Sequence, residues 1–155
     1  MTNSYDYFAG KLKCIACGET TSIDSPTNIQ TYISDKPEGR VLSEGDAVQV
    51  DVRRIENDEY DGYFTVTPPT EQEPVRILQA WDCPACGSPL NWAEIVLGDG
   101  VIHSIVSVPF DREHFARSNL ISLEVAGVAA ELLRMPIKHV LGRRAVDLLK
   151  GYFNM

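Results

Sequence analysis

The chain repeats one pentad, Cys-x-x-Cys-Gly, as Cys14-Ile15-Ala16-Cys17-Gly18 and again as Cys83-Pro84-Ala85-Cys86-Gly87, and the two copies contain all four of its cysteines. A Cys-x-x-Cys turn directs two sulfurs to one point, so two such turns provide four thiolates for a tetrahedral metal site. Zn²⁺ suits this site best, because it has no strong geometric preference and binds cysteine sulfur at about 2.3 Å. Since four protein ligands leave no position for water, the pentads predict one structural zinc ion per chain.

Three other uses of paired cysteines fit the sequence less well. A thioredoxin-like dithiol opens a helix, which Gly18 and Gly87 would interrupt in its first turn. Two disulfides need an oxidising compartment, whereas residues 1–10 lack the apolar segment of a signal peptide, so we expect a cytoplasmic protein with reduced thiols. A zinc deaminase combines His-x-Glu with Pro-Cys-x-x-Cys, but Asp82 precedes Cys83 and none of the three histidines begins a His-x-Glu.

The pentads resemble those of zinc-ribbon proteins, in which two Cys-x-x-Cys knuckles at the tips of β-hairpins share one zinc ion. The resemblance covers Lys11–Thr21 and Ile77–Val108, and it implies a fold element and four ligands but no activity. The implied ligands are Cys14, Cys17, Cys83 and Cys86. The chain departs from the compact form, which has about 15–20 residues between knuckles, because 65 residues, Gly18–Asp82, separate the pentads. We expect a folded insertion there, and closing so long a loop through the metal would remove about 4 kcal/mol of unfolded-state entropy.

Length and patterning predict a single α+β domain, residues 1–155. A chain of 155 residues with 44% apolar content can bury an adequate core, and no stretch approaches the ~20 continuous apolar residues of a membrane span. We expect a zinc-stapled antiparallel β-sheet in residues 1–110, with a long β insertion between the knuckles at residues 18–82. A C-terminal helical hairpin is expected in residues 111–155.

The predicted elements follow from local patterns. The strands are Ala47–Val52, Tyr63–Thr67, Val75–Trp81, Ala93–Leu97 and Val101–Val108, the last two joined by the turn Gly98-Asp99-Gly100. Asp111 is positioned to cap a helix that starts near Arg112. The almost wholly apolar segment Leu120–Leu133 predicts a buried helix, and Pro136 suits the first turn of a last helix that runs to Tyr152.

Charge is distributed unevenly along the chain. The formal charge is −8, and ionising four thiolates and adding Zn²⁺ makes it −10. Asp35–Glu73 contains eleven acidic residues against four basic ones, whereas residues 134–151 have a balance of +4. This pattern predicts an acidic and a basic face. The alternative is that both are solvated surface without a partner.

An acidic insertion repels the phosphates of nucleic acids and suits a basic protein partner. Its centre combines acidic side chains with tyrosines, as interface anchors with an acidic rim do, although tyrosines at these positions also fit strand residues that pack in a core. The candidate partner-binding residues are Glu56, Asp58, Glu59, Tyr60, Asp61 and Tyr63.

The sequence contains no recognisable catalytic constellation. His103 fits a surface or satisfied strand residue, His114 and His139 have no nucleophile or carboxylate at a suitable spacing, and there is no phosphate-binding glycine motif. We therefore expect a non-enzymatic, zinc-binding protein-interaction module; an immunity protein that neutralises a basic toxin is one concrete form, by analogy of size and acidity. Two alternatives stay open. A zinc-ribbon regulator or antitoxin would bind nucleic acid through Arg143, Arg144 and Lys150, and a zinc-stabilised enzyme or enzyme subunit would have a pocket that the sequence does not reveal.

Overall fold

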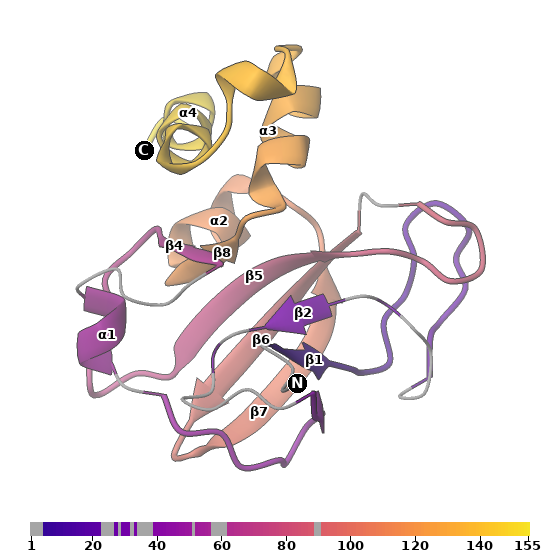
Figure 1. Cartoon of the computed structure of the whole chain (residues 1–155), viewed down its shortest axis with the longest axis vertical. Coiled ribbons are helices and arrows are strands. Elements are labelled where there is room, and N and C mark those ends of the chain that lie inside the picture. The colour runs from indigo at the N-terminus through magenta and orange to yellow at the C-terminus, as the bar shows by residue number, and fades with distance from the viewer. Residues whose placement is uncertain are drawn as a thin grey trace.

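The computed structural model describes residues 5–22, 27, 29–31, 33, 39–50, 52–56, 62–88 and 91–155. These residues form an α+β fold with two β-sheets, four α-helices and one 3₁₀-helix (Figure 1). The strands are β1 (Asp6–Phe8), β2 (Ile29–Thr31), β3 (Val41–Leu42), β4 (Tyr63–Thr65), β5 (Val75–Trp81), β6 (Asn91–Gly98), β7 (Val101–Val108) and β8 (Leu120–Ser122). The helices are α1 (Val52–Glu56), α2 (Arg112–Arg117), α3 (Val125–Leu133), η1 (Ile137–His139) and α4 (Arg143–Tyr152).

The larger sheet has the strand order β4-β8-β5-β6-β7, and the smaller one has the order β2-β1-β3. Strands β5, β6 and β7 form two consecutive antiparallel hairpins, which confirms the predicted strand Val75–Trp81 and the turn at Gly98–Gly100. The expectation of a wholly antiparallel sheet is wrong, since β8 pairs parallel to β5 and β1 pairs parallel to β3. These parallel pairs form because the chain leaves the sheet, through α2 in the case of β8, and returns beside a distant strand.

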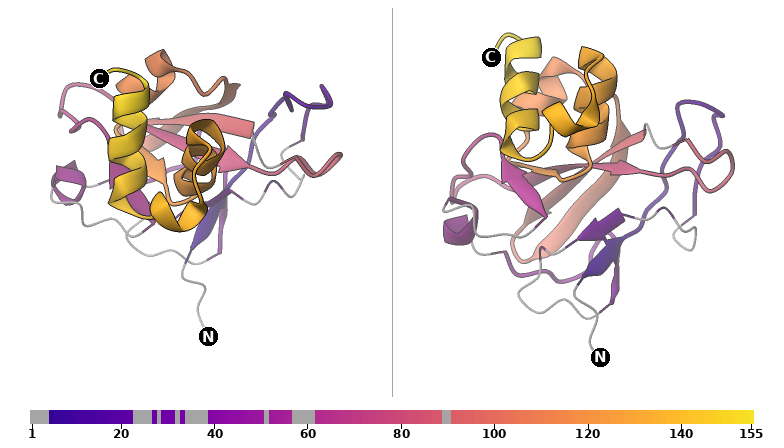
Figure 2. Two further views of the ribbon diagram at one scale, coloured as in Figure 1. Left: turned by 90° about the horizontal axis from the view of Figure 1, so that it is seen from above. Right: turned by 45° about the horizontal axis from the view of Figure 1, so that its top comes forward.

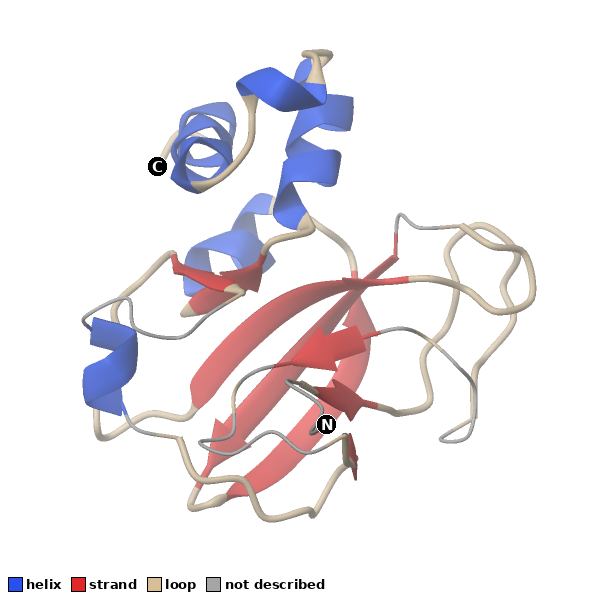
Figure 3. Cartoon of the chain, in the orientation of Figure 1, coloured by secondary structure: helices blue, strands red, loops and turns tan. Residues whose placement is uncertain are grey.

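The larger sheet separates two hydrophobic cores, and Figure 2 shows the layers on its two sides. Because side chains alternate across a strand, Ile77 of β5 packs with Phe8 in the core shared with the smaller sheet, whereas its neighbour Leu78 packs with Phe115 and Leu149 in the helical core. Helices α2, α3 and α4 gather on that second side (Figure 3). In the described part of the chain, no helix is long and apolar enough to cross a membrane.

Two predicted helices have different boundaries in the structure. The apolar segment expected as one helix, Leu120–Leu133, begins as strand β8, and only its second part forms α3. Residues 120–122 form a strand and not a helix because they lie between β4 and β5, where Ile121 pairs with Phe64 on one side and with Leu78 on the other. The last helix is divided into η1 and α4 by Gly142, whose φ of 69° lies in the left-handed region and interrupts a helix.

The strand predicted at Ala47–Val52 does not form. Ala47 makes an isolated bridge with Val101, residues 48–50 have no strand structure, and α1 begins at Val52. Val48 is nevertheless buried, and its N–H donates to the carbonyl of Gly100 over 2.8 Å. Val48 therefore belongs to a loop that covers the hairpin between β6 and β7.

Candidate metal centre

The first pentad forms a tight turn between Lys13 and Thr20, which face each other in an antiparallel bridge. Within the turn, the N–H of Gly18 donates to the carbonyl of Cys14 over 3.0 Å, and the N–H of Cys14 donates to the carbonyl of Glu19 over 2.9 Å. Gly18 has a φ of 77°, a left-handed conformation that glycine adopts without steric cost.

The second pentad has the same backbone structure. The N–H of Gly87 donates to the carbonyl of Cys83 over 2.7 Å, and the N–H of Cys83 donates to the carbonyl of Ser88 over 3.0 Å. Gly87 also has a φ of 77°. This turn lies at the end of the β5–β6 hairpin, where Trp81 pairs with Asn91. The loops that carry the two pentads lie side by side at one end of the molecule (Figure 1).

The four cysteine sulfurs converge in space. The Sγ atoms of Cys14 and Cys86 are 3.7 Å apart, those of Cys17 and Cys83 are also 3.7 Å apart, and all four lie within 4.8 Å of one another. A tetrahedral zinc ion with Zn–S bonds of about 2.3 Å separates its sulfurs by about 3.8 Å. All four cysteines are free of disulfide bonds. The cluster is thus within metal-binding distance, as in a zinc-ribbon-like element, and its dimensions fit Zn²⁺.

Burial differs systematically within each pentad. The first cysteines, Cys14 and Cys83, are buried in the core that also contains Leu12 and Trp81, whereas the second ones, Cys17 and Cys86, are exposed. A metal held by all four would therefore join the N-terminal turn to the β5–β6 hairpin at the edge of one hydrophobic core. This arrangement is typical of a structural site.

Asn91, which no sequence motif marks as part of the site, connects the two turns. Its Oδ1 accepts from the N–H of Ile15 over 2.9 Å, and its Nδ2 donates to the Sγ of Cys14 over 3.4 Å and to the carbonyl of Ser88 over 3.3 Å. Asn91 is 1% exposed. The signal in the sequence is a polar residue at the start of a mostly apolar strand, but its role depends on the fold, which brings the start of β6 beside the first turn.

The protonation of the cysteines is uneven. Burial raises the pKa of the Cys14 thiol, but the N–H groups of Cys17 and Ala16 and the Asn91 amide donate to its sulfur and lower the pKa to about 6. The N–H of Glu19 lowers the pKa of Cys17, yet partial desolvation of its sulfur and the three neighbouring thiols raise the pKa to about 12. The Cys14 thiol therefore loses its proton more readily than the Cys17 thiol, and a bound cation would supply positive charge that favours thiolates at the site.

The candidate partner-binding residues fall mostly outside the described part of the chain. Asp58, Glu59, Tyr60 and Asp61 lie outside it, and of Glu56 only the backbone, at the end of α1, is described. Tyr63 is 7% exposed, and its hydroxyl donates to Oε1 of Gln79 over 2.7 Å and contacts Thr31. The prediction that Tyr63 is an interface anchor is therefore wrong, since this side chain belongs to the core.

The candidate nucleic-acid-binding residues lie on α4. Arg143 and Arg144 are exposed in its first turn, and Lys150 is partly buried in its last turn. The two arginines and Lys150 are about 10 Å apart along the helix axis at 1.5 Å per residue. The opposite face of α4, with Ala145, Val146 and Leu149, packs in the helical core. The arginines are thus available at one end of the helix.

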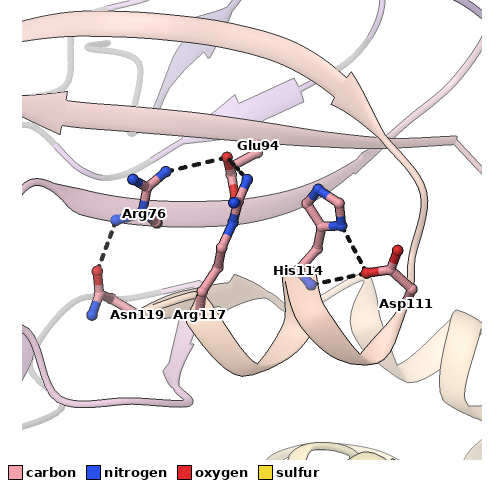
Figure 4. Close-up of polar contacts among 6 residues, drawn as sticks. All are labelled: Arg76, Glu94, Asp111, His114, Arg117 and Asn119. Atoms are coloured by element: carbon pink, nitrogen blue, oxygen red, sulfur yellow. Dashed lines mark hydrogen bonds and ion pairs between the residues drawn. The ribbon is translucent and has the colours of Figure 1, made fainter.

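A second polar cluster lies on the helical side of the large sheet (Figure 4). Glu94 of β6 is 3% exposed, and its two carboxylate oxygens accept from Nε and Nη2 of Arg117 over 2.8 and 2.7 Å. Arg76 of β5 donates to the same carboxylate over 3.3 Å. The hydrogen bond with Glu94 raises the pKa of Arg117. Two guanidinium groups neutralise Glu94, so the cluster ties α2 to the sheet.

The start of α2 contains a carboxylate–histidine pair. Asp111 Oδ1 accepts from the N–H of His114 over 2.9 Å and lies 2.7 Å from Nδ1 of the same histidine (Figure 4). The predicted helix cap at Asp111 is confirmed, whereas the expectation that His114 has no carboxylate partner is wrong, because the first turn of the helix brings residues three apart together.

Comparison of the chain with protein-family models, curated proteins and solved structures gives no match.

Proposed function

We propose that this protein is a zinc-stabilised, non-enzymatic protein-binding module that binds a basic partner protein. The observation that carries the proposal is the four-sulfur cluster, whose sulfur–sulfur distances of 3.7 Å suit a zinc ion with protein ligands alone. Four thiolates leave no coordination position for water or substrate, so we assign the metal to folding. It joins two turns that are distant in the sequence.

Charge supports the partner class. The formal charge of the chain is −8, and it becomes −10 when four thiolates hold one Zn²⁺. A strongly acidic protein attracts basic partners and accelerates their association. An inhibitor that neutralises a basic toxin, such as an immunity protein, is one concrete form of this function.

Capture with the zinc-loaded full chain tests the proposal. The protein is immobilised, proteins from its native cells are passed over it, and each captured protein is purified and remixed with it. We expect a basic protein that forms a stoichiometric complex, and we expect association to slow as salt is added because the charges are screened. Recovery of acidic partners only, or of none that re-forms a complex, contradicts the proposal.

A second candidate function, nucleic-acid binding, is favoured by the exposed Arg143 and Arg144 at the start of α4. The net charge of the chain opposes it, so we expect only weak duplex binding that disappears steeply as salt rises. Gel-shift titration at about 0.15 M salt distinguishes the two candidates. A sequence-specific complex at nanomolar protein concentration, lost when both arginines are replaced by alanine, would place nucleic-acid binding first.

A further inference from the structure

An open groove of about 490 Å³ lies on the helical side of the fold, between α3, η1 and the end of β5. Its walls include Leu123, Ile137 and Leu141, which are 53%, 54% and 57% exposed. Large apolar side chains so exposed around one concave surface are typical of an interaction site in a soluble protein. Figure 1 shows α3 standing above the sheet next to the end of β5.

Gly127 in the middle of α3 also lines the groove. Glycine destabilises a helix interior relative to alanine, so Gly127 lowers the stability of α3. A Cβ added at Gly127 would meet no heavy atom within 4 Å. The packing of this chain therefore does not require glycine, whereas a ligand that approaches the backbone of α3 closely would require it.

The charged residues in the groove are all acidic. Asp82, Glu124 and Glu131 line it, and the described residues that form its walls include no lysine or arginine. An apolar surface with a carboxylate rim complements a segment whose apolar side chains are flanked by basic ones. A second copy of this chain is a poorer occupant, because two molecules of charge −8 repel each other.

We propose that this groove binds a segment of another protein in which exposed apolar side chains are flanked by lysine or arginine. The inference rests on the proposed protein-binding function and names the surface that performs it. Leu123, Ile137 and Leu141 contact the apolar side chains, Gly127 admits the backbone or a bulky side chain, and Glu124 and Glu131 face the flanking cations.

The test uses a fluorescently labelled peptide of about 14 residues, built from leucine and lysine so that the leucines form one helical face. Its anisotropy is titrated with the zinc-loaded full chain and with the variants Leu141→Ser, Gly127→Leu and Glu131→Gln. Leu141→Ser and Gly127→Leu should each weaken binding about tenfold, and Glu131→Gln should weaken binding at low salt and reduce its salt dependence. Gly127→Leu should melt no lower than the parent, because leucine favours helix and the site is open.

Two control variants replace an exposed apolar residue and an exposed acidic residue that do not line the groove. Val41→Ser on β3, where Val41 is 59% exposed, and Asp147→Asn on α4 should bind the peptide as the parent does. A peptide with glutamate in place of lysine should not bind.

Absence of peptide binding, equal binding by all the variants, or equal binding of the glutamate peptide overturns the assignment of the groove. The protein-binding function survives such a result if the chain still captures a basic protein that re-forms a complex. A dimer in sedimentation that Leu141→Ser dissociates also overturns it, since a second copy would then be the occupant.

Discussion

Replacing Asn91 by alanine should weaken zinc binding although Asn91 is not itself a metal ligand. The side chain donates to the Sγ of Cys14 over 3.4 Å, and it holds the turn around that cysteine by accepting from the N–H of Ile15 over 2.9 Å. A third hydrogen bond, to Ser88, reaches the other turn. Without these bonds the thiolate of Cys14 loses a donor and the two turns lose their direct polar connection, so the four sulfurs are less well arranged before the metal binds.

The three hydrogen bonds of Asn91 set the size of the expected loss of free energy. A buried hydrogen bond contributes about 0.5–1.5 kcal/mol net, so the three together contribute about 1.5–4.5 kcal/mol, with the two longer ones toward the low end. Loss of groups that orient metal ligands typically weakens affinity about 10–100-fold, or about 1.4–2.7 kcal/mol. We therefore expect the zinc dissociation constant of Asn91→Ala to rise about 10–100-fold, with the rest of the loss appearing as lower stability of the metal-free chain.

Competition with a chromophoric chelator under reducing conditions measures the zinc affinity, and urea unfolding measures stability with and without the metal. Asn119→Ala is the matched control, because Asn119 is also buried and hydrogen-bonded, to Arg76 and Thr67, which lie outside both turns. The control should lose stability and keep its zinc affinity. An Asn91→Ala protein whose zinc affinity stays within about twofold of the parent would refute the reasoning and leave Asn91 a residue of the fold alone.

Three further predictions test the site and its supports. Elemental analysis should find about one zinc per chain, Cys83→Ser combined with Cys86→Ser should abolish it, and chelation should lower the melting temperature markedly; zinc retained by the double variant would contradict a shared site. Glu94→Gln should destabilise the fold by about 2 kcal/mol, because it removes the charge of a buried carboxylate that pairs with two partly solvated arginines. Replacement of the exposed Glu113 by glutamine should change little. Equal urea midpoints for Glu94→Gln and the parent would show that stability does not need the cluster. Asp111→Ala should cost about 1 kcal/mol. A backbone N–H that donates to Asp111 lowers its pKa, so this contribution is complete above the unfolded pKa of about 3.9 and is lost as the pH falls through the lower folded value. Melting curves of the two proteins should therefore converge in acid, and a difference that grows there would argue against the cap.

Features that depend on a few consecutive residues could be predicted from the sequence. The pentads specify two similar turns because a Cys-x-x-Cys-Gly segment closes its own hydrogen bonds, between Gly18 and Cys14 and between Gly87 and Cys83. The hairpin between β6 and β7 and the cap of α2 are local in the same way. Strand β5 was predictable from its apolar residues.

The remaining features depend on which distant segments meet. A short apolar segment is compatible with either a buried strand or a buried helix. Leu120–Ser122 forms strand β8 because β4 and β5 pair with it on its two sides. Asn91 acts on Cys14 only because β6 lies beside the first turn, and the groove exists only because η1 and α3 pack next to the end of β5. The sequence by itself therefore determined the two cysteine turns, since their hydrogen bonds close within a few residues. The tertiary structure decided the sheet order, the convergence of the four cysteines with their support by Asn91, and the exposed groove, since these require contacts between residues far apart in the chain.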